Sequence, residues 1–227
     1  MNMINKLIII IPARMNSKGI KKKNLKRINS KSLINISIKQ AIKLKPKKIF
    51  VSSEDKSLKK KIIINKNIEF HERSKKLSND NVHTIYVVLD IIKKYKIQND
   101  ALIGLMLPTY PLREISKIKK QIQKFDIKKY YSLVGVTETK SYENNIRYLD
   151  NKGKLIAKNF NLKQRQKSKK VFFVNGSFFL SSCKNIKKFK NFHNSKNMKP
   201  IFCDPKLSID INNHSDLEAV RKHFTKI

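Results

Sequence analysis

The sequence predicts an α/β fold in which strands and helices alternate and the strands form a mainly parallel, doubly wound sheet. The first observation is the run of five apolar residues Leu7–Ile11, which is typical of a strand buried on both faces. Pro12 ends this strand because proline has no N–H to donate to a sheet. The second observation is that short apolar runs alternate with segments of helical period. A length of 227 residues suits a single domain, so we expect one domain over residues 1–227 with a small excursion.

A polar loop leaves this first strand at its carboxyl end. It contains the hydroxyl of Ser17, the flexible backbone of Gly19, the amide of Asn24 and the cations of Arg14, Lys18 and Lys21–Lys23. Open α/β sheets bind ligands at this edge, and a polyphosphate requires backbone N–H donors together with positive charge. The alternative is a lysine-rich connection without a ligand, since the stretch matches neither GxxxxGK[ST] nor GxGxxG.

The net charge of +36 would usually indicate a nucleic acid or an anionic membrane as partner. Arginine, which reads bases with its bidentate fork, accounts for only seven of the 52 basic residues, and the 45 lysines occur in every segment. Lysine, isoleucine and asparagine are abundant together, as AT-rich coding sequences produce. We therefore favour a compositional origin of the charge over nucleic-acid binding, although the charge would attract an anionic substrate.

The cysteines, histidines and apolar runs indicate neither export nor a metal cluster. Cys183 and Cys203 lack the CxxC or Cys/His spacing of zinc sites, and the five histidines lack metal-ligand spacing. The longest apolar run is too short to span a bilayer and ends in proline and arginine rather than in a cleavage site. We expect reduced thiols, packing or surface roles for the histidines, a cytoplasmic location and no membrane partner.

The remaining helices and strands are predicted from the spacing of apolar residues and from the residues that begin or end each element. Helices are expected over residues 32–44, 58–64, 82–95 and 115–125, with a closing helix up to residue 224. Strands are expected over residues 48–53, 68–70, 101–107 and 131–136. Pro46 follows the end of the first helix, and Ser53 or Glu54 is expected to cap the second.

Two further loops follow predicted strands and are candidates for ligand contacts. In the loop over residues 72–80, Arg73 can clamp a phosphate, whereas Asp80 is better interpreted as the cap of the next helix. The loop over residues 108–113 is stiffened by Pro108 and Pro111. It could hold a flat base or be a rigid turn, and the residues alone favour neither reading.

Turn-forming residues predict two hairpins in the second half of the chain. Between residues 138 and 170 the pattern breaks into short pieces around a turn at 150–153, which predicts a hairpin that leaves the sheet. Asn175-Gly176 lies between two apolar runs, and its simplest interpretation is a type I′ hairpin turn.

The stretch 207–217 carries the candidate metal ligands. Alternation places Asp210 and Asn212 on one face of a strand, with Ile209 and Ile211 on the other. A carboxylate beside an amide oxygen suits Mg²⁺, which takes one or two carboxylates and completes its shell with phosphate oxygens and water. Asp216 is expected in the first turn of the closing helix, where its role is structural.

Six motifs between Ile11 and Asp216 together resemble the acylneuraminate cytidylyltransferases, the CMP-sialic acid synthetases. They are IPAR-x-x-SKG-x-x-x-KN-L, Arg73-x-x-x-Leu77-x-x-Asp80, PTYPLR, Arg165-Gln166, the strand around Asn175-Gly176, and the stretch that holds Asp210 and Asn212. They occur in the order of that family and span nearly the whole chain. This combination is far more specific than any one of the motifs.

The resemblance implies a three-layer α/β/α sandwich of the nucleotide-diphospho-sugar transferase type, with a dimerisation arm at about residues 138–170 and therefore a homodimer. It implies the transfer of CMP from CTP to the anomeric hydroxyl of a nonulosonic (sialic-type) acid, with release of pyrophosphate and with Mg²⁺ as cofactor. The implied catalytic residues are Arg14, Lys23 and Asp210, and the metal ligands are Asp210 and Asn212. The implied nucleotide ligands are Arg14, Ser17, Lys23, Asn24, Arg73, Thr84, Pro108 and Thr109, and the implied sugar ligands are Arg165, Gln166 and Asn175.

Several positions depart from the polar residues that the family carries, and they keep alternatives open. They are Leu107, Phe173, Phe179 and Asn212, where the family has glutamine, often arginine, tyrosine and aspartate. A catalytically weakened, nucleotide-binding relative would account for these changes, and a CMP-Kdo synthetase is the nearest enzyme. A basic nucleic-acid-binding protein would account for the charge and for little else.

Overall fold

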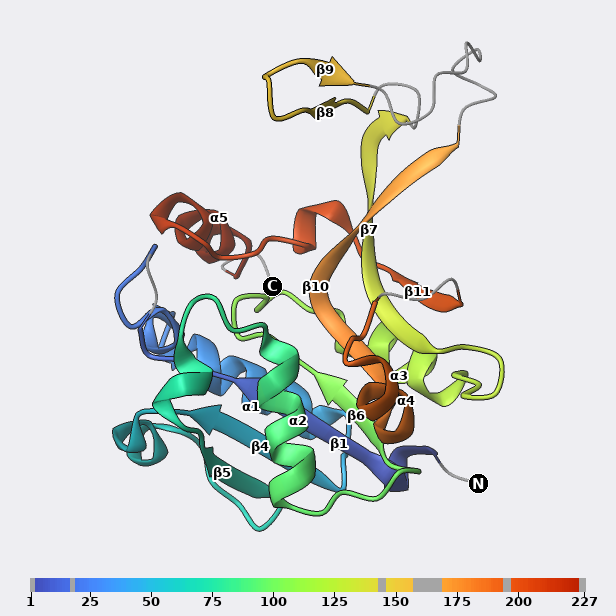
Figure 1. The fold of residues 1–227 in the computed structure, drawn as a ribbon. Helices are drawn as coiled ribbons and strands as arrows, with labels where there is room; N and C mark the ends of the chain where they lie inside the picture. Colours follow the sequence, from blue (N-terminus) through green and yellow to red (C-terminus); the bar gives the residue numbers. More distant parts are fainter. Residues whose placement is uncertain (1–2, 17–18, 143–145, 157–168, 194–196, 225–227) are drawn as a thin grey trace.

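A computed structural model describes residues 3–16, 19–142, 146–156, 169–193 and 197–224. These residues form a seven-stranded sheet in the order β11-β7-β10-β6-β1-β4-β5 (Figure 1). Its strands are β1 (Leu7–Pro12), β4 (Lys48–Ser53), β5 (Ile68–Glu72), β6 (Leu102–Leu105), β7 (Ser132–Tyr142), β10 (Lys170–Ser182) and β11 (Met198–Phe202). Both antiparallel pairings involve β10, and the other pairings in this sheet are parallel. The predicted mainly parallel sheet is confirmed.

Helices cover both faces of the sheet, which gives the three predicted layers (Figure 1). The helices are α1 (Leu33–Lys43), α2 (Thr84–Lys94), α3 (Ile115–Gln123), α4 (Cys183–Phe189) and α5 (His214–Phe224). Along β1, Leu7, Ile9 and Ile11 face one core while Ile8 and Ile10 face the other. Side chains of α1 and α3 complete the first core, and those of α2 and α4 complete the second. Each buried isoleucine stabilises the fold by about 1.5–3 kcal/mol through loss of apolar surface.

A third, smaller core lies under the closing helix α5. Leu217 and Val220 of α5 pack in it with Ile211 and with Ile20, which belongs to the loop after β1. The end of the chain is therefore held against the first loop by apolar burial. Among the described residues, no helix has the length and apolar character needed to cross a membrane.

The prediction of a helix over residues 58–64 is wrong. The chain instead forms the short 3₁₀ helix η3 (Lys56–Lys61), and extended backbone begins at Ile62. The run of β-branched residues Ile62–Ile64 disfavours continuation of a helix. Its cap is Asp55, whose carboxylate accepts from the Ser57 N–H at 2.8 Å, and not Ser53 or Glu54.

The hairpin turn expected at Asn175-Gly176 is also wrong, because both residues lie inside the continuous strand β10. The pairing of β10 with β7 shifts register between Val174 and Phe179, which marks a bulge. Gly176 has φ +75°, and a Cβ there would lie 3.1 Å from the ring of Tyr110. The left-handed backbone and the close approach of Tyr110 together favour glycine here, and the strand continues through it.

The stretch around Asp210 is not a strand of the sheet. It follows the 3₁₀ helix η7 (Pro205–Leu207) as an extended connection, and the Ile211 N–H donates to the Thr109 carbonyl at 3.0 Å. The expected alternation nevertheless holds, since Ile211 is fully buried and packs in the third core while Asn212 is exposed. Asp216 lies in the first turn of α5, as predicted.

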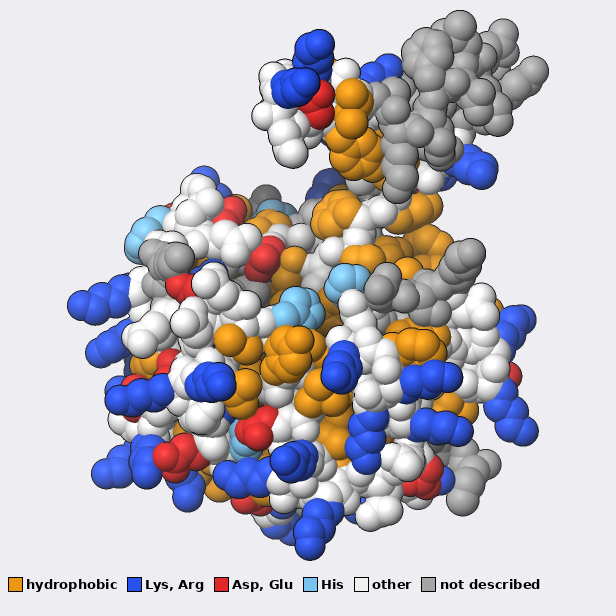
Figure 2. Space-filling view, viewed as in Figure 1, with side chains coloured by type: hydrophobic (Ala, Val, Ile, Leu, Met, Phe, Trp, Pro, Cys, Tyr) orange, Lys and Arg blue, Asp and Glu red, His pale blue; other side chains and the backbone are white. Residues whose placement is uncertain are grey.

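Strands β7 and β10 continue beyond the body of the molecule as a projecting ribbon (Figure 1). Near its end, β8 (Tyr148–Leu149) and β9 (Leu155–Ile156) pair as the hairpin that the sequence predicts. Hydrophobic side chains gather where this ribbon leaves the body (Figure 2). Phe172, Phe173 and Phe202 belong to this region and are 40–57% exposed.

Candidate functional site

A cavity of about 370 Å³ opens at the carboxyl ends of β1, β5 and β6. It is bordered by residues from three segments that are far apart in the sequence: Pro12, Arg14, Lys23, Asn24, Arg73, Leu77, Asn79, Asp80, Val82, His83, Thr84, Val87, Leu107, Pro108 and Thr109. Because parallel strands end at the same edge of a sheet, the loops that follow them converge there. The seven nucleotide candidates that lie among the described residues all border this cavity.

One part of the cavity is cationic and is built from the loop after β1. Lys23 lies in the 3₁₀ helix η2 (Lys23–Leu25), and its Nζ donates to the Ile211 carbonyl at 2.8 Å. Burial lowers the pKa of Lys23, an effect that the negative charge of Asp210 opposes. Asn24 is 5% exposed and donates from Nδ2 to the Arg14 carbonyl at 2.7 Å, so it braces the loop.

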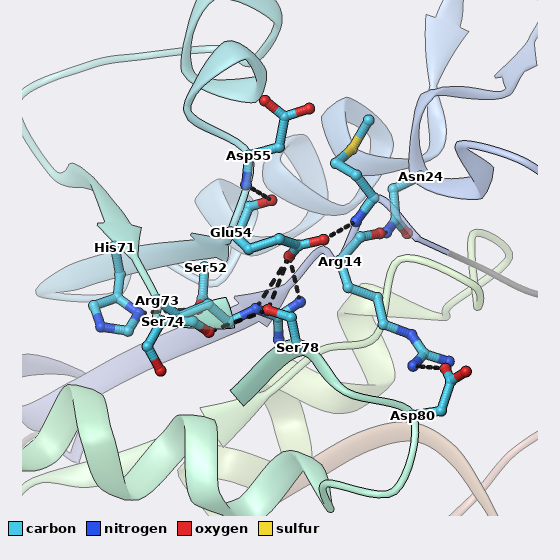
Figure 3. Close-up of polar contacts among 12 residues, drawn as sticks. Arg14, Asn24, Ser52, Glu54, Asp55, His71, Arg73, Ser74, Ser78 and Asp80 are labelled. Carbon is cyan, nitrogen blue, oxygen red and sulfur yellow. Dashed lines mark hydrogen bonds and ion pairs between the residues drawn. The ribbon is translucent and has the colours of Figure 1, made fainter. Parts of the chain in front are cut away.

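Arg14 and Asp80 form an ion pair across the cavity (Figure 3). The expectation that Asp80 caps the following helix is therefore wrong. That cap is His83, whose Nδ1 accepts from the Ile85 N–H at 3.3 Å, and α2 accordingly begins at Thr84 rather than at residue 82. The carboxylate of Asp80 pairs with a nearby guanidinium instead of with the helix N-terminus.

Another part of the cavity wall is apolar and stiff. It is formed by Val82 and Val87 around the start of α2, together with Leu107 and Pro108 after β6. Thr84 and Thr109 add hydroxyl groups to the lining. An apolar wall with a few polar groups, next to a cationic region, suits a ligand that has a flat ring and a charged chain.

Asp210 lies near the cationic part because the loop after β1 packs directly on its segment. A Cβ on Gly19 would lie 2.2 Å from the Asn212 carbonyl oxygen, so only glycine permits this approach. Asp210 Oδ2 accepts from Asn212 Nδ2 at 3.0 Å, while Oδ1 is buried without a hydrogen-bond partner among the described residues. Burial, and then the negative charge of Asp210, raise the pKa of the Tyr110 hydroxyl.

The comparisons with known proteins identify the family. A family model described as "Cytidylyltransferase" matches residues 8–221. The chain belongs to the cytidylyltransferase family. It is 27% identical over 227 aligned positions to N-acylneuraminate cytidylyltransferase of Streptococcus agalactiae serotype III (strain NEM316), an alignment that covers 96% of this chain and 53% of that protein. This chain thus spans about half the length of that relative.

Relatives of nearly the same length also exist. The chain is 26% identical to CMP-N,N'-diacetyllegionaminic acid synthase of Legionella pneumophila subsp. pneumophila (strain Philadelphia 1), with 96% of this chain and 95% of that protein covered. Among solved structures, a CMP:2-keto-3-deoxy-manno-octonic acid synthetase complexed with CTP superposes with a TM-score of 0.69 at 10% identity, covering 98% of this chain and 99% of that one. At this identity the superposition shows that the fold is shared.

Part of the family's predicted sugar site is not brought to the cavity. Asn175 is 2% exposed, donates from Nδ2 to Thr137 Oγ1 at 2.8 Å and accepts from the Ser177 N–H at 2.9 Å, so it stabilises the bulge in β10. Phe179 packs in the core against Phe192. Leu107, by contrast, borders the cavity. Ser17, Arg165 and Gln166 lie outside the described residues.

The sequence analysis missed Glu54, which lies at the centre of the polar contacts beside the cavity (Figure 3). It was interpreted as a possible helix cap, although it directly follows β4. Its carboxylate contacts the loop after β1 and the segment after β5. The only available signal was its position, because acidic residues at the end of a strand next to a cationic loop are candidates for pairing with that loop.

Arg113 has no predicted role beyond its place in the PTYPLR motif. In the structure it holds the loop after β6. It is 8% exposed and donates to the carbonyls of Ser177 and Leu107 and to Gln40 Oε1. These bonds connect β10, α1 and the start of the cavity loop that holds Pro108 and Thr109.

We expect Arg113→Met to lower the free energy of unfolding by about 3 kcal/mol or more, because each buried acceptor that loses its donor costs about 1–3 kcal/mol. Arg113→Lys keeps the charge but lacks the planar guanidinium, so its free energy of unfolding should lie between those of the wild type and Arg113→Met. Urea denaturation measures both, with the exposed Arg27→Met as control. Equal stability of Arg113→Met and the wild type would contradict this role.

Proposed function

We propose that the chain is a cytidylyltransferase that transfers CMP from CTP to the anomeric hydroxyl of a nonulosonic acid and releases pyrophosphate. The observation that carries this proposal is the cavity, which joins a cationic region at Arg14 and Lys23 to an apolar wall at Leu107 and Pro108. Membership of the cytidylyltransferase family and relatives named for N-acylneuraminate and N,N'-diacetyllegionaminic acid support the choice of nucleotide and sugar class.

The cavity suggests how CTP would lie. Its triphosphate would contact Arg14, Lys23 and Asn24 after β1 and Arg73 after β5, and Ser17 is a further candidate from its place in the sequence. Its nucleoside would lie along Thr84, Pro108 and Thr109. Three cations around one polyanion neutralise the charge that accumulates when pyrophosphate leaves.

Asp210 and Asn212 fit a magnesium site. The buried Asp210 Oδ1 has no hydrogen-bond partner among the described residues, and a carboxylate oxygen in that condition is a suitable ligand for a hard cation. Bound Mg²⁺ would neutralise phosphate charge and orient the reacting groups. The residues present supply one carboxylate and one amide, and phosphate oxygens and water would complete the shell.

The chemical step is a displacement at the α-phosphorus. The anomeric oxygen forms a bond to this phosphorus, the bond from the phosphorus to the oxygen that bridges to the β-phosphate breaks, pyrophosphate leaves with that electron pair, and the hydroxyl proton passes to water. The chain contributes by positioning and by electrostatics: Lys23 and Arg14 hold the phosphates, and Arg165 and Gln166 are the candidates for the sugar side. A cation at 165 would suit the sugar carboxylate.

The test is pyrophosphate release from CTP and Mg²⁺ with single nonulosonic acids and with Kdo. We expect release with one nonulosonic acid, and at least about a 100-fold loss of turnover in Asp210→Ala, because charge stabilisation at the reacting group is lost. Glu218→Ala, on the exposed side of α5, is the control. Release with Kdo alone would contradict the proposed sugar class, and near-normal turnover of Asp210→Ala would remove this residue from the mechanism.

Arg14→Ala should weaken CTP binding by about 10- to 100-fold, since a charge-assisted hydrogen bond contributes about 1.5–3 kcal/mol. Calorimetry with CTP and Mg²⁺ measures the change. Lys21→Ala removes an exposed cation from the same loop and should change the affinity by less than about threefold. Unchanged affinity in Arg14→Ala would argue against the loop after β1 as a phosphate site.

We also propose a homodimer that uses the projecting ribbon, which includes the described part of the arm predicted at about residues 138–170. Support comes from the apolar residues that this region exposes to solvent in the single chain: Tyr148, Leu149, Leu155, Ile156, Phe172, Phe173 and Phe202. Exposed apolar patches of this kind mark protein interfaces.

Sedimentation velocity should therefore show a dimer that Phe173→Asp dissociates. Phe189→Asp is the matched control, since Phe189 is 52% exposed but lies on α4, away from the ribbon. A wild-type monomer at micromolar concentration would contradict the dimer.

A cytoplasmic location completes the proposal. Cys183 and Cys203 are free thiols, which is the usual state of cysteines in a reducing compartment.

A further inference from the structure

Glu54 connects two segments that border the cavity, although it does not itself border it (Figure 3). Its Oε1 accepts from the Met15 N–H at 2.8 Å. Its Oε2 accepts from Arg73 Nη2 at 3.0 Å and from Ser78 Oγ at 3.2 Å. The side chain is 10% exposed, so these contacts are shielded from solvent.

Each partner of Glu54 adjoins residues that form the cavity wall. Met15 follows Arg14 in the chain, and Arg73 is itself part of the lining. Ser78 lies at the end of η4 (Lys75–Ser78), between the lining residues Leu77 and Asn79. One carboxylate thus fixes the loop after β1 relative to the segment after β5.

The charge of Glu54 also changes what Arg73 can do. Burial raises the pKa of the Glu54 carboxyl, but hydrogen bonds from the Glu54 and Met15 N–H groups and from Arg73 outweigh it, so the pKa lies below its usual value. The group is therefore ionised at neutral pH and balances the guanidinium of Arg73. Arg73 thus borders the cavity as one half of an ion pair, as Arg14 does with Asp80.

We propose that Glu54 is a positioning residue of the nucleotide site, which holds the Arg14–Met15 backbone and the Arg73 guanidinium in the arrangement that binds the triphosphate. The proposal rests on the proposed function, because the triphosphate is the ligand of that function. Glutamine has nearly the same shape but supplies one acceptor oxygen instead of two, and it leaves Arg73 without an ionic partner.

Glu54→Gln should bind CTP about tenfold more weakly than the wild type, because hydrogen bonds and charge that preorganise the loop are lost. Hydrogen exchange of the amides at residues 13–16, measured without CTP, should become about tenfold faster. Glu72→Gln is the control: it removes a carboxylate of an exposed ion pair with Lys56, next to Arg73, and should change neither quantity. In an Arg73→Met background, Glu54→Gln should cost less affinity than in the wild type, because the two residues act as a pair.

The outcomes separate this role from the proposed function. CTP affinity of Glu54→Gln within twofold of the wild type would overturn the proposal, even if the melting temperature falls, since a purely structural role predicts that pattern. A wild type that does not bind CTP would overturn the proposed function. In that case the amide exchange still decides whether Glu54 holds the loop: faster exchange supports it, and unchanged exchange overturns it.

Discussion

The parallel pairing of β1 with β4 on one side and β6 on the other is the constraint on which the site depends. Ile10 lies opposite Phe50 of β4 and opposite Leu105 of β6, so the three strands run in register and end at one edge of the sheet. Because β1 is buried on both faces, its end has little freedom to move. The loops after β1 and β6, together with the segment after β5, which pairs with β4, therefore converge on one cavity without any long-range polar contact being needed to bring them together.

Ion pairs and hydrogen bonds within the protein then hold the converging loops in place. Arg14 pairs with Asp80, Arg73 with Glu54, and Lys23 donates to the Ile211 carbonyl. The remaining positive charge is of another kind: lysine and arginine side chains spread over the visible face rather than gathering at one place (Figure 2). Screening by salt weakens exposed charges of that sort, whereas charges held at a cavity are screened less. The large net charge and the site are thus separate features.

The first loop and the closing helix meet beside the site through apolar burial. The third core packs Ile20 of the first loop against Ile211 and α5, and the missing side chain of Gly19 lets the backbones approach. Asp210 reaches the neighbourhood of Lys23 for this reason. A candidate metal ligand near the end of the chain is in this way placed beside cations from its beginning.

The sequence by itself determined the class of fold, the strands β1, β4, β5 and β6 with the first half of β7, most of the helices and the cationic loop, but it did not predict β11 or the continuity of β10. A continuous apolar run and a helical repeat of apolar residues can both be recognised in consecutive residues. The strand at Leu7–Ile11 and helix α1 therefore follow from local sequence. The six motifs also determined the family, which the match over residues 8–221 confirms. Tertiary structure decided the partners: Asp80 pairs with Arg14, Gly176 lies against Tyr110, and Glu54 joins the loop after β1 to the segment after β5. Local pattern is silent on such contacts, because each depends on which distant segments the sheet and the apolar cores bring together.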